Sequence, residues 1–116
     1  METEKHPVEV RFSAEFKKNL RRLAKKYRRI RKDVEPVIQQ LQKGETLGDQ
    51  VQGTSFQVFK VRVKNSNLKK GKRAGYRIIY YLKQAEQIIL ITIYSKTEQP
   101  DLAAHQIRRL IQRDNQ

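Results

Sequence analysis

The sequence contains no cysteine, no tryptophan and only two histidines. Without cysteine there is neither a disulfide framework nor thiolate chemistry. The histidines, His6 and His105, are too few and too far apart to form a zinc site by themselves. The acidic residues are also not clustered in the way that a magnesium-dependent nuclease requires. We therefore expect no metal and no small-molecule cofactor.

Long hydrophobic runs are missing as well. No apolar stretch approaches the roughly 20 residues that a membrane-spanning helix needs. The first seven residues, METEKHP, lack the apolar segment of a secretory signal. These absences favour a cytoplasmic protein, and we expect no membrane-spanning segment.

Positive charge is what the sequence has in excess. Lysine and arginine number 26 against 12 aspartates and glutamates, so the formal net charge is +14. A compact body with this excess attracts polyanions from a distance. Nucleic acid, an anionic membrane surface and an acidic protein partner all remain candidates, because charge alone does not choose among them. The length of 116 residues suits a single domain, 1–116, with one core.

The first half of the chain predicts a strand followed by two helices. Apolar and polar residues alternate over residues 8–12, as in a short strand. Ser13 is a suitable cap for a first helix with a strongly basic outer face, and Asp33 is a suitable cap for a second helix. Pro36 would then lie in a first turn, where proline is tolerated, and residues 45–55 read as a polar loop. The two apolar stripes are Phe16, Leu20, Leu23 and Tyr27, then Val34, Val37, Ile38 and Leu41.

The second half predicts three strands and a helix. The strands fall near residues 56–64, 73–83 and 88–94, and the last of these is apolar on both faces, as in a central strand. Residues 102–111 follow with the spacing of an amphipathic helix. Short connections make the three strands antiparallel. The expected fold class is therefore α+β, in the order β-α-α-β-β-β-α, with a small antiparallel sheet, a helical hairpin and a C-terminal helix.

Cations are concentrated on neighbouring strands of this sheet. Three of them alternate along one face of the strand at 56–64, and such a face is poorly suited to burial. The next strand adds Arg77, whose planar guanidinium binds phosphate through paired hydrogen bonds that a lysine cannot make. Surface charge for solubility is the alternative, and it suits a single lysine better than the whole set. The three cations are Lys60, Arg62 and Lys64, and Tyr94 and Lys96 end the last strand near the same surface.

Three segments resemble the second half of a RelE/ParE superfamily toxin of type II toxin–antitoxin systems. They are FKVRV at 59–63, RAGYRIIYY at 73–81 and ITIYSK at 91–96, and the order of elements is also that of the superfamily. The resemblance implies a cognate antitoxin as partner. For the RelE-like branch it also implies a metal-independent endoribonuclease that cuts messenger RNA on the ribosome.

Several residues take roles from this resemblance. Lys60 and Arg62 match a basic pair, Arg77 matches a phosphate-gripping arginine, and Lys96 matches a basic position after the last strand. With Tyr94, these are the predicted catalytic residues. The first helix and the loop at 65–72 have the charge to bind RNA, although the helix is equally consistent with a solvated face or with contact to an acidic antitoxin segment. The predicted RNA-binding residues are Lys25, Lys26, Lys64, Lys69, Lys70, Lys72 and Arg73.

The sequence also departs from the RelE pattern. Thr97 stands where the family has an arginine, and the region of Ala103 lacks a tyrosine that stacks on the cut base. Tyr94 or His105 would have to replace that tyrosine, so the proton acceptor and donor stay open. These departures favour the alternative of a ParE-like inhibitor of DNA gyrase without chemistry of its own, whereas the cationic strand face favours the ribonuclease. A harmless nucleic-acid-binding relative is a third alternative.

Overall fold

The computed structural model describes residues 8–69, 71–84 and 86–116, and within them the predicted order of elements is confirmed. None of the described helices is long and apolar enough to cross a membrane. The first half comprises β1 (Glu9–Phe12), α1 (Ala14–Lys26), α2 (Ile30–Gln42) and β2 (Asp49–Val51). The second half comprises β3 (Val58–Val63), the short 3-10 helix η1 (Lys72–Ala74), β4 (Tyr76–Gln84), β5 (Gln87–Ser95) and α3 (Ala104–Asp114).

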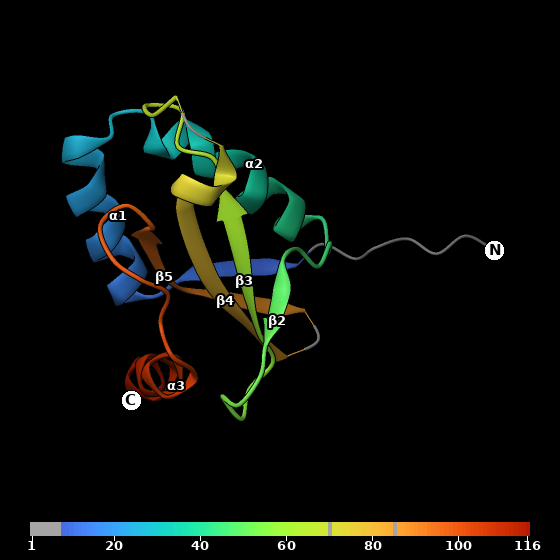
Figure 1. The fold of residues 1–116 in the computed structure, drawn as a ribbon. Helices are drawn as coiled ribbons and strands as arrows, with labels where there is room; N and C mark the ends of the chain where they lie inside the picture. The colour runs from blue at the N-terminus through green and yellow to red at the C-terminus, as the bar shows by residue number, and fades with distance from the viewer. Residues whose placement is uncertain (1–7, 70, 85) are drawn as a thin grey trace.

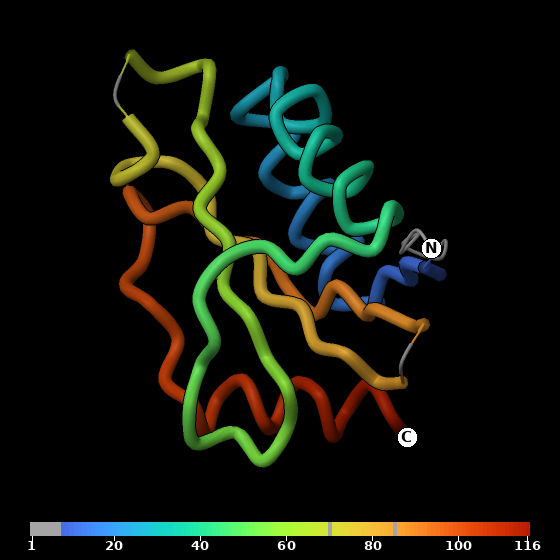
Figure 2. The backbone as a smooth tube through the Cα atoms, turned by 90° about the vertical axis from the view of Figure 1, so that its right-hand side faces the viewer, coloured from blue at the N-terminus to red at the C-terminus, as the bar shows by residue number. Residues whose placement is uncertain are grey.

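The strands form one sheet in the order β1-β5-β4-β3-β2. The pairs β2–β3, β3–β4 and β4–β5 are antiparallel, whereas β1 pairs parallel with β5. Helices α1 and α2 cover one face of this sheet, and α3 lies against the other face (Figures 1 and 2). On this second face Arg62 of β3 is exposed, whereas the β4 residues Arg77, Ile79 and Tyr81 are buried.

Each face of the sheet has its own apolar core. Under α1 and α2, the helix residues Phe16 and Leu23 pack against strand residues such as Val61 and Ile78. Under α3, Ile107 and Ile111 pack against Tyr94 and the other residues of the second cluster. The strand predicted to be central, β5, lies between β1 and β4, which explains why it is apolar on both sides.

The two helix starts test the predicted caps. At α1, Ser13 Oγ accepts a hydrogen bond from the Phe16 amide at 3.0 Å, as predicted, and also donates one to the Ile91 carbonyl at 2.7 Å. At α2 the predicted cap is wrong, because the helix begins three residues before Asp33. Only residues 28 and 29 separate Tyr27 from the first residue of α2, so the helix starts earlier than predicted. The Asp33 carboxylate instead accepts a hydrogen bond from the Ser66 amide.

The segment predicted as a polar loop, 45–55, contains the short strand β2. Its three residues pair antiparallel with Val58–Lys60 of β3. Strand pairing here overrides the polar composition, because the edge of β3 offers free backbone groups. Gly48, at φ +83°, allows the close approach, since a Cβ at that position would collide with the Lys60 carbonyl. The third predicted strand starts later than expected, at Tyr76, because residues 72–74 form η1.

Candidate functional site

The predicted strand cations lie on the face of the sheet that also carries α3. The register places Arg62 of β3 directly opposite Arg77 of β4, which is in turn opposite Tyr94 of β5. Lys60 is two residues from Arg62 along β3 and therefore points to the same face. The structure thus places side chains from three neighbouring strands on one face of the sheet. The shared face of Lys60 and Arg62 is what the period-two pattern predicts.

Arg62 and Arg77 resolve their like-charge contact by pointing in different directions. Directly opposed like charges are unfavourable in an antiparallel pair. Arg62 is exposed, whereas Arg77 is only 4% exposed. The Arg77 guanidinium donates to the carbonyls of Lys72, Tyr76 and Arg73 at 2.9, 3.1 and 3.1 Å. Arg77 therefore holds η1 on the end of the sheet, and Arg62 is the arginine that faces solvent.

Burial changes the acid–base behaviour of Arg77. It lowers the pKa of the guanidinium from its usual value, and the neighbouring Arg62 lowers this pKa further. The three carbonyl dipoles compensate for part of the lost hydration. Its role as a phosphate-binding residue stays a prediction, since these carbonyls already occupy much of the guanidinium.

Asp101, in the segment between β5 and α3, contacts three of the predicted catalytic residues. Its Oδ2 lies 3.3 Å from Lys60 Nζ and 3.5 Å from Lys96 Nζ, and its Oδ1 accepts a hydrogen bond from the Tyr94 hydroxyl at 2.9 Å. Both lysines are about a quarter exposed, at 28% and 27%. Lys60, Tyr94, Lys96 and Asp101 are called the Asp101 cluster below.

The Asp101 cluster favours a charged carboxylate and a neutral phenol. Partial burial raises the pKa of Asp101, but the hydrogen bonds from Tyr94 and Lys60 outweigh this effect, and the net shift is downward. Burial raises the pKa of Tyr94, and its hydrogen bond to Asp101 raises it further. At neutral pH the cluster therefore holds a carboxylate between two lysines, with a protonated tyrosine behind it.

Sequence reasoning missed Asp101. A single aspartate after a proline carries no motif, and it belongs to a segment without regular structure. One sequence feature could have indicated Asp101: it lies five residues after Lys96, so a short turn can bring the two side chains together.

The positions at which this chain differs from the RelE pattern are close to Asp101 in the sequence. Thr97 and Ala103 are exposed, and so is His105, which is on α3.

A hollow of about 410 Å³ adjoins the cluster at the edge of β3. It exists because β2 pairs with β3 only as far as Lys60, so the edge beyond Lys60 is left uncovered. Lys60, Arg62 and Lys72 contribute cations to its wall, opposite Leu47, Gly48 and Asp49. The cations and the hollow together provide room for an anionic group beside the sheet.

The predicted RNA-binding residues fall on two different surfaces. Lys64, Lys69, Lys72 and Arg73 are exposed and lie in the connection between β3 and β4, which includes η1. Lys70 lies outside the described residues. Lys25 and Lys26 are exposed on α1, on the other face of the sheet, so the structure does not bring them to the Asp101 cluster.

Glu98 ties the segment after β5 to α1. Its carboxylate lies 3.2 Å from Lys26 Nζ and 3.4 Å from Arg22 Nη1. The hydrogen bond to Glu98 raises the pKa of Lys26, which also lies over the Tyr27 ring at 5.2 Å from its centroid. The same short segment therefore carries one carboxylate to each face of the sheet, Glu98 to α1 and Asp101 to the strand cations.

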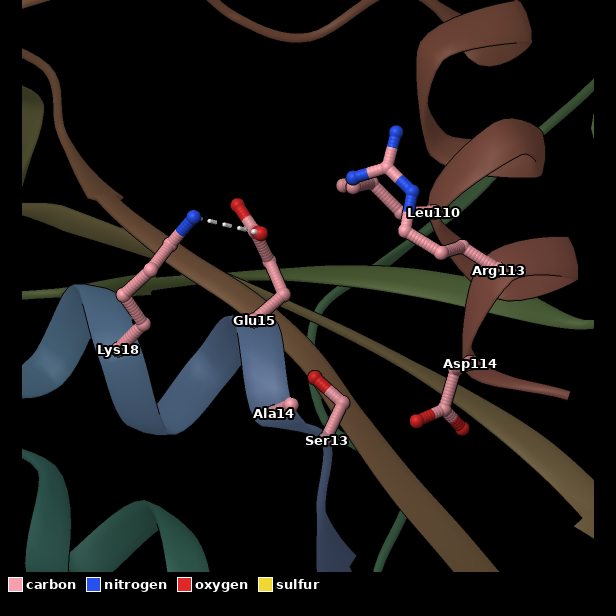
Figure 3. A pocket seen from close by; sticks show the side chains of 7 residues that line it. All are labelled: Ser13, Ala14, Glu15, Lys18, Leu110, Arg113 and Asp114. Atoms are coloured by element: carbon pink, nitrogen blue, oxygen red, sulfur yellow. Dashed lines mark ion pairs between the residues drawn. The ribbon is translucent and has the colours of Figure 1, made fainter. Parts of the chain in front are cut away.

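A second hollow, of about 250 Å³, lies between the start of α1 and the end of α3. Figure 3 shows its walls, which include Leu110 and Arg113 of α3 and the ion pair between Lys18 and Glu15 of α1, at 3.5 Å. No predicted site residue lines it. Among the described residues, no group of three or more His, Cys, Asp or Glu side chains is arranged to hold a metal ion.

Comparison with protein-family models gives a match over residues 10–100. The matching family is described as the ParE toxin of type II toxin-antitoxin system, parDE. The match runs from β1 into the segment that contains Asp101, so it covers well over half of the chain and all five predicted catalytic residues.

Proposed function

The chain belongs to the ParE toxin family of type II toxin–antitoxin systems, and from the geometry of its strand cations we propose that it stops growth by cutting messenger RNA on the ribosome. As a toxin of this family it pairs with a cognate antitoxin. The observation that carries the ribonuclease proposal is the Asp101 cluster beside the exposed Arg62. Here two lysines, a carboxylate and a neutral phenol lie within hydrogen-bond or ion-pair distance of one another, and the lysines and Asp101 are partly exposed.

The proposed reaction uses the 2′-hydroxyl of the RNA as the nucleophile. Its oxygen forms a bond to the adjacent phosphorus while the bond from phosphorus to the 5′-oxygen breaks, which gives a 2′,3′-cyclic phosphate and a 5′-hydroxyl. The 2′-hydroxyl loses its proton and the leaving 5′-oxygen gains one. Lys60, Arg62 and Lys96 supply positive charge to the phosphorane as it forms.

Arg62 is the residue to change first, because it is exposed and its loss leaves the core untouched. We expect Arg62→Ala to weaken growth arrest after induced expression and to reduce cleavage, with at least a tenfold loss in rate. Arg31→Ala is the matched control, since Arg31 is also an exposed arginine and lies on α2, across the sheet. Mapping the 5′ ends of messenger RNA in the same cultures measures cleavage. Thermal melts of both variants verify folding.

The wild-type protein should produce cuts in phase with codons. Growth arrest with intact messages would contradict the ribonuclease proposal. Continued growth with a folded wild-type protein would contradict a toxin that acts alone, and would favour the harmless nucleic-acid-binding relative.

Inhibition of DNA gyrase is the second candidate, and two observations favour it. The family match is to the ParE toxin, and Arg77 already donates to three backbone carbonyls rather than standing free for a phosphate. A supercoiling assay with purified gyrase and purified toxin tests this candidate directly. Loss of supercoiling together with intact messages would establish the binder in place of the nuclease.

A further inference from the structure

Two ammonium groups and one hydroxyl converge on the Asp101 carboxylate from two strands, two of them through hydrogen bonds and Lys96 through an ion pair. Lys60 approaches Oδ2 from β3, Lys96 approaches the same oxygen from the end of β5, and Tyr94 of β5 donates to Oδ1. Two ammonium groups and one hydroxyl directed at a single small anion are also a suitable donor set for a phosphate, because both anions accept charge-assisted hydrogen bonds through paired oxygens.

We propose that Lys60, Lys96 and Tyr94 form a cradle for one phosphodiester group of RNA, which the Asp101 carboxylate occupies as a competitor until RNA binds. This inference rests on the proposed function for the nature of its ligand. Exchange of one singly charged anion for another leaves the charge within the cradle unchanged. The cost of binding is therefore the loss of the contacts that Asp101 makes.

Asp101 is the member of the cluster that can leave. Lys60 and Tyr94 belong to paired strands, and Lys96 is fixed by its amide, which donates to the Gly75 carbonyl at 3.0 Å. Asp101 lies in the irregular segment before α3, and its side chain is 41% exposed. Rotation of this exposed side chain would therefore free Lys60, Lys96 and Tyr94 without moving a strand.

The alternative role for Asp101 is to position the two lysines, and the two roles predict opposite effects on affinity. If Asp101 competes with RNA, its neutralisation frees two ammonium groups and strengthens binding. If it positions the lysines, neutralisation disperses them and weakens binding. Two partly exposed ion pairs correspond to about a three- to thirtyfold gain in affinity when the competitor is removed.

The experiment compares the binding of a short single-stranded RNA to the wild-type protein, Asp101→Asn and Glu35→Gln, by fluorescence anisotropy. The probe carries 2′-O-methyl groups, so it lacks the nucleophile and is not cut while its affinity is measured. Glu35→Gln is the matched control, because Glu35 is an exposed acidic residue on α2, across the sheet from the Asp101 cluster, and its change alters net charge equally. The double variant Asp101→Asn with Lys60→Met tests whether the gain depends on Lys60.

We expect Asp101→Asn to bind three- to thirtyfold more tightly than wild type, Glu35→Gln to stay within about twofold, and the double variant to lose the gain. Equal affinities of Asp101→Asn and Glu35→Gln, or weaker binding by Asp101→Asn, would overturn the proposal. Since the probe cannot be cut, this result is independent of cleavage. A wild-type protein that leaves messages intact would refute the proposed function while the comparison of affinities still decides the role of Asp101.

Discussion

The stability of Arg77→Ala shows whether Arg77 holds the fold together through its hydrogen bonds or is free to bind a phosphate. Arg77→Ala deletes three hydrogen bonds to backbone carbonyls, which at about 1 kcal/mol each is a loss of about 3 kcal/mol. It also removes the like charge opposite Arg62, which returns about 0.2–1 kcal/mol. The expected net loss in the free energy of unfolding is about 2–3 kcal/mol. For a chain of 116 residues this corresponds to a fall in Tm of about 8–12 °C.

Urea unfolding and thermal melts of Arg77→Ala and Arg62→Ala measure this difference. Arg62 is the matched control, because it is the cross-strand partner of Arg77 but is exposed. Its loss should leave stability within about 0.5 kcal/mol of wild type while RNA affinity and its salt dependence decrease. Wild-type stability in Arg77→Ala would refute the reasoning, since the guanidinium would then be free to bind a phosphate.

Two further predictions concern the backbone and the tyrosines. Gly48→Ala should cost more than about 2 kcal/mol, because it adds a strained positive φ to a collision with the Lys60 carbonyl. In urea unfolding, Gly53→Ala should cost only the strain, about 1 kcal/mol, and equal losses in the two variants would contradict the collision. Burial is the main cause that raises the pKa of four tyrosines in the folded protein. The folded state therefore favours the neutral phenols, and their contribution to stability is complete below the unfolded pKa of about 10 and is lost as pH rises above it. Urea unfolding at pH 8 and pH 10.5 should show this loss, and equal stabilities would count against it; the tyrosines are Tyr76, Tyr80, Tyr81 and Tyr94.

The elements with strong hydrophobic periodicity were predictable from the sequence. The apolar stripes of α1 and α2, the alternation along β3 and the continuous apolar run of β5 all agree with the structure. Local signals failed where a distant partner decides the conformation. β2 forms in a polar segment because β3 offers it an edge, and α2 starts before its predicted cap because the turn after Tyr27 is short.

The candidate site divides in the same way. The period-two pattern correctly placed Lys60 and Arg62 on one face, because side-chain direction along a strand follows from sequence alone. It could not show that Arg77, on the same face, turns away to the carbonyls of η1. Nor could it find Asp101, whose position depends on the path of an irregular segment rather than on any repeat. The sequence identified the cations of the site but not the groups with which they form hydrogen bonds and ion pairs.

The parallel pairing of β1 with β5 sets the order in which a growing chain can fold. Glu9 and Gln87 are register partners and lie 78 residues apart in the sequence. During synthesis the first strand therefore leaves the ribosome without a partner and waits for nearly the whole of the remaining chain. Contacts this distant in sequence slow folding, because the intervening loop must close before they form. The sheet is completed only after its last-made strand, β5, is inserted between β1 and β4.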